Sequence, residues 1–168
     1  MWLYIFLVLL GLLLVFHGVL GILGSRLPET HVATASVELS ASPQKVWEQI
    51  NDVASFPTWV PDITKMERQP DENGKEVWRQ TSGRNVFTTV NDVCDPPRRV
   101  LRTIKDEKGP FSGSWDHVIE DLGNGRCKLS ITETGKVPGA ASRAIMHYFF
   151  GETYFMNRFL GAVKARIG

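Results

Sequence analysis

The sequence has almost no excess of charge of either sign, since its 168 residues carry 19 Lys and Arg against 18 Asp and Glu. Proteins whose main partner is nucleic acid present a strongly basic face to the phosphate backbone, so this balance argues against that class. Beyond the apolar N-terminal stretch the chain has no internal repeat and no low-complexity segment. We therefore expect one domain with a short appendage, and no nucleic-acid partner.

The sequence also lacks the spacings that bind metals. Its four histidines are far apart, and neither His-x-x-x-His nor Cys-x-x-Cys occurs. Ligands of a structural or catalytic metal usually recur at such short spacings. The sequence therefore predicts no metal site, and no motif indicates a cofactor.

Charge is missing altogether from Trp2 to Leu23. A helix of this length spans about 33 Å, enough for the roughly 30 Å hydrocarbon core of a bilayer. We predict a transmembrane anchor over residues 1–25. A cleaved signal peptide is the alternative, because Gly21, Gly24 and Ser25 are small and lie where cleavage would occur. The apolar run exceeds the roughly 7 to 15 residues of a signal core, and no Lys or Arg precedes it, which favours the anchor.

Residues 26–31 are the expected linker between the anchor and a domain over residues 32–168. Arg26 places basic charge directly after the span, which favours a cytoplasmic domain. Pro28 stiffens the linker, which reaches on the order of 20 Å at about 3.5 Å per residue. The domain is therefore expected to stay against the bilayer surface.

The domain itself has the patterning of an antiparallel sheet. Residues 33–39 alternate apolar and polar side chains, as a strand with one buried face does. Ser42 and Pro43 then open a short helix, as N-cap and first helical residue, and a second short helical segment follows. Turn residues, including those near 108–110, delimit six further strands, at 63–68, 75–81, 85–93, 99–104, 111–120 and 127–135. With the strand at 33–39, the expected total is seven. The short connections indicate that neighbouring strands are antiparallel.

The last segment, residues 140–167, predicts one long amphipathic helix. Its apolar residues recur three, four or seven positions apart, and aromatic residues widen the apolar face. Such a face needs a large apolar surface to lie on. The predicted fold class is α+β, with a curved seven-stranded antiparallel sheet around a long C-terminal helix.

Basic residues gather around the strand at 99–104, where Arg98, Arg99, Arg102 and Lys105 lie close in sequence. We expect a solvated edge on which the arginine stems cover apolar surface. Contact with anionic lipid headgroups is the alternative, because the linker is short.

A resemblance to a known family rests on three stretches, SVELSASPQKVWEQINDVASFPTWVPDI, FSGSWDHVIE and LSITETGKVP. They resemble the START-like superfamily of polyketide cyclases, dehydratases and lipid-transfer proteins, also called SRPBCC. The resemblance implies a helix-grip fold with an apolar cavity between sheet and C-terminal helix. It would also place Cys94 and Cys127 about three strands apart, roughly 14 Å, too far for a disulfide. Unpaired thiols favour a reducing compartment.

Strand parity selects residues that face the cavity. Glu133 shares a face with Leu129 and Ile131. Pairing about the turn at Gly123 sets Trp115 opposite Glu133, with His117 one diagonal step away. Glu133 and His117 are therefore candidate catalytic residues, because burial raises a carboxyl pKa and suits it to proton transfer. A buried polar network is the favoured alternative, since no nucleophile or second carboxylate accompanies the pair.

The leading functional hypothesis is a membrane-tethered module that binds an apolar small molecule such as a lipid, isoprenoid or quinone. Parity and helical face select its lining residues, which are Trp78, Phe87, Trp115, Leu129, Ile131, Tyr148, Phe149, Met156 and Phe159. The second hypothesis is a cyclase, dehydratase or hydrolase that uses Glu133 and His117. The third is an interaction module whose cavity is closed by aromatic side chains. Nothing in the sequence indicates an oligomeric state.

Overall fold

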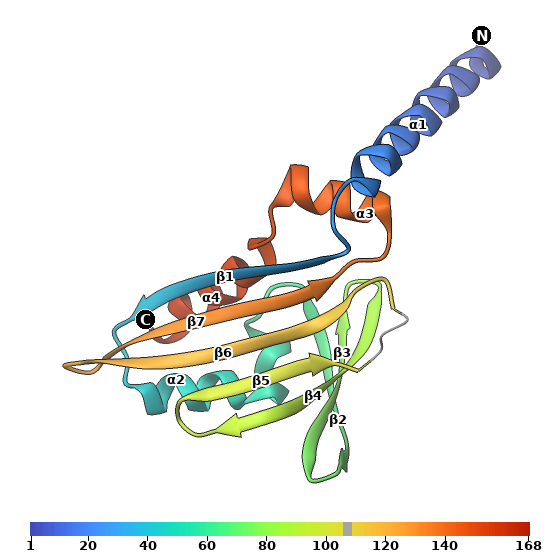
Figure 1. Ribbon diagram of the computed structural model, residues 1–168. Helices are drawn as coiled ribbons and strands as arrows, with labels where there is room; N and C mark the ends of the chain where they lie inside the picture. The colour runs from blue at the N-terminus through green and yellow to red at the C-terminus, as the bar shows by residue number, and fades with distance from the viewer. Residues whose placement is uncertain (106–108) are drawn as a thin grey trace.

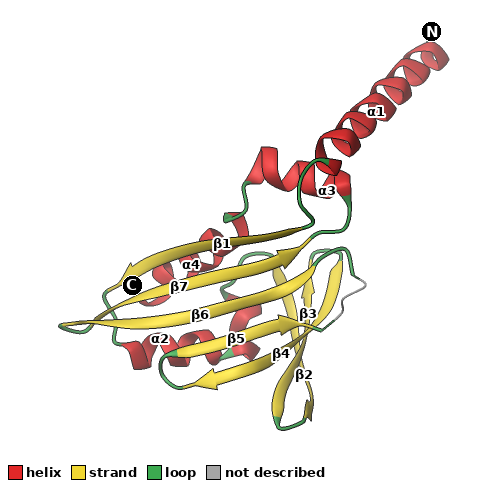
Figure 2. Ribbon diagram, in the orientation of Figure 1, coloured by secondary structure: helices red, strands yellow, loops and turns green. Residues whose placement is uncertain are grey.

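The computed structural model describes residues 1–105 and 109–168 and contains a seven-stranded antiparallel sheet with helices against one face (Figures 1 and 2). The strands are β1 (Thr30–Leu39), β2 (Ile63–Glu72), β3 (Lys75–Ser82), β4 (Asn85–Asp95), β5 (Arg99–Ile104), β6 (Ser112–Gly123) and β7 (Arg126–Lys136). Their order across the sheet is β1-β7-β6-β5-β4-β3-β2. The helical elements are α1 (Trp2–Ser25), α2 (Pro43–Asn51), the 3₁₀ helix η1 (Val53–Thr58), α3 (Ala140–Ile145), the π-helical turn η2 (Met146–Phe150) and α4 (Tyr154–Ile167).

The seven predicted strands are confirmed, and the last hairpin has the predicted register. Trp115 on β6 lies opposite Glu133 on β7. The turn between them contains Asn124 and Gly125, both at positive φ. Gly and Asn adopt this conformation most readily, which explains why the turn was readable from the sequence. Residue 108, in the turn expected after Ile104, lies outside the described residues.

The hydrophobic core of the described residues lies between the sheet, α2 and α4. The Ser42 hydroxyl caps α2 by accepting a hydrogen bond from the Lys45 amide, and Pro43 begins the helix, as the sequence predicts. Val46 and Ile50 of α2 are fully buried in this core. Burying an aliphatic side chain of this size contributes about 1.5–3 kcal/mol. The amphipathic face of α2 therefore holds it against the sheet.

The C-terminal segment is not the single helix that its periodicity predicts. Gly151 ends η2 with φ of 83°, outside the helical region, and α4 begins only at Tyr154. Glycine adopts this backbone conformation without a Cβ clash, so the helix can end there at little cost. As a result α4 stays on the sheet, while α3 packs against the end of α1 and η2 continues from α3 (Figure 1).

Helix α3 packs on the last turns of α1. A Cβ on Gly24 would lie 1.7 Å from the carbonyl oxygen of Ala140, so only glycine allows this approach. Arg143 donates from Nε to the Gly24 carbonyl at 3.0 Å, and from Nη1 to the carbonyls of Val137 and Pro138 at 2.9 and 2.6 Å. The end of α1 is thus fixed to the domain by packing and by a largely buried arginine.

The rest of α1 projects away from the domain (Figure 1). It has 24 residues, its most apolar window has a mean hydropathy of 2.7, and 6% of that window is buried. By length and composition it could cross a membrane. β1 begins at Thr30, inside the segment expected to be linker, so four residues separate it from α1.

The two cysteines lie on strands three positions apart, Cys94 on β4 and Cys127 on β7, and both are free. This is the separation that the resemblance implied, and it confirms that they do not form a disulfide.

Candidate functional site

The face of the sheet that α2 and α4 cover is called the inner face. Directly paired residues of neighbouring strands point to the same face, so one row across it contains Ala33, Glu133, Trp115, Arg102 and Asn91. The end of the sheet nearest α1 is called here the α1 end. It contains the start of β1, the end of β7 and the turn between β3 and β4. The candidate site residues divide according to their distance from this end.

Beneath α4 the inner face is filled with side chains. Four predicted lining residues are core residues, with Leu129, Ile131 and Met156 fully buried and Phe159 5% exposed. The Phe159 ring centroid lies between 5.7 and 6.0 Å from those of four other rings, Phe56, Trp59, Trp115 and His117. Such tilted and edge-on contacts are the preferred aromatic geometries. Aromatic side chains thus close this part of the expected cavity.

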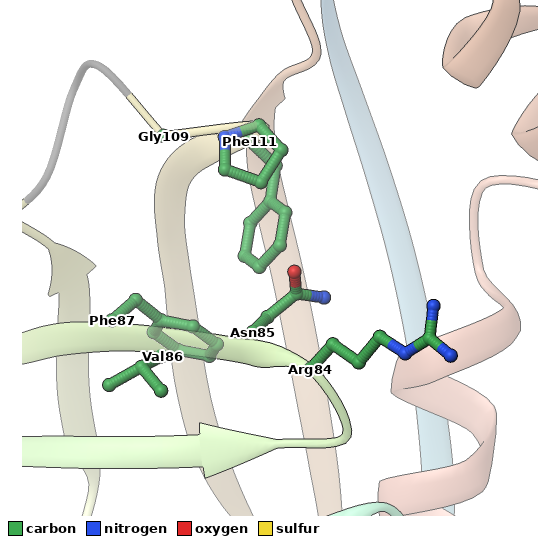
Figure 3. A pocket seen from close by; sticks show the side chains of 7 residues that line it. Arg84, Asn85, Val86, Phe87, Gly109 and Phe111 are labelled. Atoms are coloured by element: carbon green, nitrogen blue, oxygen red, sulfur yellow. The ribbon is translucent and has the colours of Figure 1, made fainter.

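Phe87, another predicted lining residue, borders a hollow at the α1 end of the sheet (Figure 3). The hollow measures about 220 Å³ and is lined by Arg84, Asn85, Val86, Phe87, Gly109, Pro110 and Phe111. The Phe87 and Phe111 rings meet edge to face, with centroids 5.3 Å apart. Two phenyl rings in a lining that also contains Arg84 and Asn85 suit part of an apolar ligand that has a polar end.

Trp78 is partly buried and is a diagonal neighbour of Phe87 across the β3–β4 pair, because Phe87 lies opposite Gln80. Its indole N–H is buried and has no hydrogen-bond partner among the described residues. A buried donor without a partner costs about 1–3 kcal/mol. The N–H is covered by protein atoms, and Trp78 is not among the residues that line the hollow.

Tyr148 and Phe149 do not join these residues. They lie on η2, where their side chains are 55% and 65% exposed. The break at Gly151 removes η2 from the inner face. The expectation that they line one cavity with Phe159 is therefore wrong in this structure.

His117 is buried on the inner face and hydrogen-bonded to the backbone. Its Nδ1–H donates to the Val100 carbonyl oxygen at 3.3 Å, and it lies opposite Ile131 rather than Glu133. Burial, assisted by the charge of Arg102, lowers the pKa of His117 to about 3. The ring is neutral at physiological pH, which suits a structural role better than proton transfer.

Glu133 has a different histidine beside it. The Nε2 atom of His31 on β1 lies 3.6 Å from Glu133 Oε1, and each side chain is about one-fifth exposed. Burial raises the pKa of Glu133, and the negative charge of Glu152 adds to this, while His31 and the Trp115 indole oppose it. Gly135 makes room for the pair, because a Cβ there would lie 2.4 Å from the His31 ring.

Sequence reasoning missed His31 because it assigned residues 26–31 to a linker. The signal was present, since the alternation of residues 33–39 extends back to His31 with the same parity. A carboxyl group with a raised pKa beside a histidine can exchange a proton with a ligand or hydrogen-bond its polar end.

We predict that His31→Ala raises the pKa of Glu133 further. The substitution removes the neighbour that most favours the carboxylate, while burial and Glu152 stay in place. The measurement is a titration of the Glu133 side-chain carboxyl by carbon-13 NMR. His147→Ala is the matched control, because His147 lies 3.8 Å from Glu152 rather than beside Glu133. An unchanged Glu133 titration in His31→Ala would show that the pair does not interact in solution.

Arg102 corrects the expectation of a uniformly solvated basic edge. Its guanidinium points into the inner face, where it donates to the Ile50 carbonyl at 2.7 Å and to the side-chain oxygens of Asn51 and Asn91 at 2.9 and 3.2 Å. It also lies 5.7 Å from the Phe56 ring centroid. Burial lowers the pKa of Arg102 to about 10. Arg102 therefore joins the end of α2 to the sheet.

A second hollow, of about 570 Å³, lies at the other end of β3 and β4. Its lining is more polar and includes Asn51, Glu76, Asn91 and the ion pair of Lys75 and Asp92, whose charged atoms are 2.8 Å apart. This lining does not match the apolar ligand that the sequence predicts.

A curved seven-stranded antiparallel sheet with a C-terminal helix on its inner face is the helix-grip fold of START-like proteins. Residues 30–168 match the family described as polyketide cyclase / dehydrase and lipid transport, and the chain belongs to this family. The resemblance stated from the sequence is thereby confirmed.

Solved structures agree on the fold. The chain is similar to the Zhui aromatase/cyclase from Streptomyces sp. R1128, with a TM-score of 0.68, 18% identity and coverage of 82% of this chain and 93% of that one. It is also similar to a START superfamily protein from Mycobacterium smegmatis, with a TM-score of 0.67, 18% identity and coverage of 82% of this chain and 97% of that one. A third similar structure is truncated norcoclaurine synthase from Thalictrum flavum, with a TM-score of 0.64, 13% identity and coverage of 82% of this chain and 92% of that one. No curated protein sequence matches the chain significantly.

Proposed function

We propose that the protein is a membrane-tethered module that binds an apolar small molecule, of the lipid, isoprenoid or quinone type, on the inner face of its sheet. The observation that carries this proposal is the hollow that the contacting rings of Phe87 and Phe111 help to line. The family to which the chain belongs includes lipid-transport proteins.

The position of the hollow supports a membrane source for the ligand. It lies at the α1 end of the sheet, where the β3–β4 turn and the segment before β6 meet. With α1 as an anchor over residues 1–25 and the domain over residues 32–168, a ligand leaving the bilayer would meet this end first. At about 220 Å³ the hollow is smaller than the roughly 300–1,000 Å³ of sites for whole drug-sized ligands. It therefore suits a ring or a short stretch of chain from a larger molecule.

The experiment is native mass spectrometry, with lipid extraction, of the intact chain purified from membranes. We expect a co-purifying apolar compound, reduced about tenfold by Phe87→Ala, since a tenfold change in affinity corresponds to about 1.4 kcal/mol of lost ring contact. Val118→Ala is the matched control, because Val118 is exposed on the opposite face of the sheet. Thermal unfolding of both variants separates lost binding from lost folding. A wild-type chain without any apolar compound would overturn the proposal.

An enzyme of the cyclase, dehydratase or hydrolase type is the second candidate. The observation that favours it is the raised pKa of Glu133 beside His31 at the α1 end of the sheet. His117, the partner expected from the sequence, is neutral and bonded to the backbone, so His31 replaces it in this mechanism. In an enzyme, Glu133→Gln would trap an unconverted substrate that differs from the compound bound by the wild-type chain in mass or, for a cyclisation that loses no water, in chromatographic retention. In a binding module both chains would carry the same compound.

A further inference from the structure

A group of exposed apolar side chains surrounds the helix break at Gly151. Phe149 is 65% exposed, and the group, called here the η2 surface, comprises Ile145, Tyr148, Phe149, Phe150 and Phe155. None of these residues belongs to the core between sheet and helices. Exposed aromatic residues so close together indicate a surface that another apolar phase covers.

The η2 surface is connected directly to α3, the helix that packs on the end of α1. Helix α3 packs on the end of α1, whose buried residues are Leu20 and Gly24, and Arg143 donates a hydrogen bond to the Gly24 carbonyl. η2 follows α3 directly, without an intervening loop. The contact between α1 and α3 therefore sets where the backbone of η2 lies relative to the last turn of α1 (Figure 1).

The side chains of the η2 surface suit the interfacial region of a bilayer, between hydrocarbon and headgroups. The last turn of a membrane-spanning helix lies where hydrocarbon meets headgroups, and aromatic side chains with polar tips concentrate there. Tyr148 has such a tip, and its ring lies 4.8 Å from the ring of His147. His147 in turn lies 3.8 Å from Glu152, and both side chains are about half exposed. Apolar rings beside polar, hydrated groups fit this boundary.

We propose that the η2 surface inserts into the interfacial layer of the bilayer that α1 enters. This inference rests on the membrane tether of the proposed function. We assign the η2 surface to the bilayer rather than to a second copy of the chain. The contact between α1 and α3 places the bilayer that α1 enters next to this surface in every molecule. Insertion would hold the α1 end of the sheet, with its hollow, against the membrane.

The test uses the full-length chain reconstituted in phosphatidylcholine vesicles that contain doxyl-labelled lipids. Cys94→Ser removes the exposed thiol, while the remaining native thiol, on Cys127, is fully buried. An environment-sensitive fluorophore is then attached through Phe149→Cys on the η2 surface, or through Val118→Cys on the outer face of the sheet, as matched control. Both positions are exposed, so folding is expected to persist. Leu13→Cys, exposed in the middle of α1, reports on the span itself.

We expect shallow doxyl groups to quench the label at position 149 at least threefold more than the label at 118, and iodide to reach only the label at 118. Deep doxyl groups should quench the label at 13. The inference is overturned if iodide reaches position 149 as readily as 118 while position 13 is still quenched by lipid. Loss of quenching at position 13 would overturn the tether and the inference together. Protection of position 149 without lipid quenching, with self-quenching that grows with protein density, would assign the surface to a second copy instead.

Discussion

Phe159→Ala is expected to lower the free energy of unfolding of the domain by about 3–5 kcal/mol, the usual cost of deleting a buried phenyl ring. Phe159 is 5% exposed and contacts rings from η1 and from β6. Removing it leaves a cavity that these rigid rings cannot easily fill. Because domains of this size are stable by only about 5–15 kcal/mol, the variant would retain a small margin.

Phe149→Ala is the matched comparison, since both phenylalanines were expected on one face of one helix. Phe149 lies on η2 and is 65% exposed, so its removal should change stability by less than about 0.5 kcal/mol. Chemical denaturation of each full-length variant in detergent, followed by tryptophan fluorescence, measures the difference. Equal losses in the two variants would mean that the helix is continuous over the sheet, contrary to the break at Gly151.

Acidification is expected to destabilise the domain through His117. The pKa of this ring falls from 6.5 to about 3 on folding, because it is buried near Arg102. Between these pH values the unfolded chain binds a proton that the folded chain does not, so stability is lost as pH falls. A single group of this kind contributes a slope of roughly 1.4 kcal/mol per pH unit. The loss begins near pH 6.5 and continues toward pH 3.

His117→Gln separates this effect from those of other groups. Glutamine keeps a donor for the Val100 carbonyl but does not titrate. The raised pKa of Glu133 acts in the opposite direction, and it is present in both chains. The difference in slope between wild type and variant, from unfolding curves taken between about pH 4 and pH 7, therefore reports on His117 alone. Parallel curves would show that His117 is protonated in the folded state.

Local patterns were sufficient to predict the sheet and much of the inner face. Alternation and turn residues located all seven strands, and the turn at residues 123–125 set Trp115 opposite Glu133. These signals are local, since a hairpin turn determines which residues pair beyond it. The burial of Leu129 and Ile131 follows from the same parity.

Other features depended on contacts that no local pattern reports. The apolar periodicity of residues 140–167 continues across Gly151, so it could not show that the first half packs beside α1 and only the second half on the sheet. Arg102 was read as part of a solvated edge because its partners Ile50 and Asn51 are more than fifty residues away in sequence. His31 is different, because the local alternation did extend to it, but only its partner Glu133 on the last strand gives it a role in the site.

The position of β1 has a consequence for the order in which the chain folds. β1 follows α1 directly, yet it is an edge strand whose neighbour is β7. Thr34 and Thr132, whose hydroxyl oxygens are 3.0 Å apart across this pair, are 98 residues apart in the sequence. Strands β2 to β6 each pair with strands that are adjacent in the sequence. During synthesis they can therefore pair before the partner of β1 has been made. β1 is thus the first strand to be synthesised, but it can pair only when β7 has left the ribosome. The pairing of β1 with β7 is therefore among the last steps of folding.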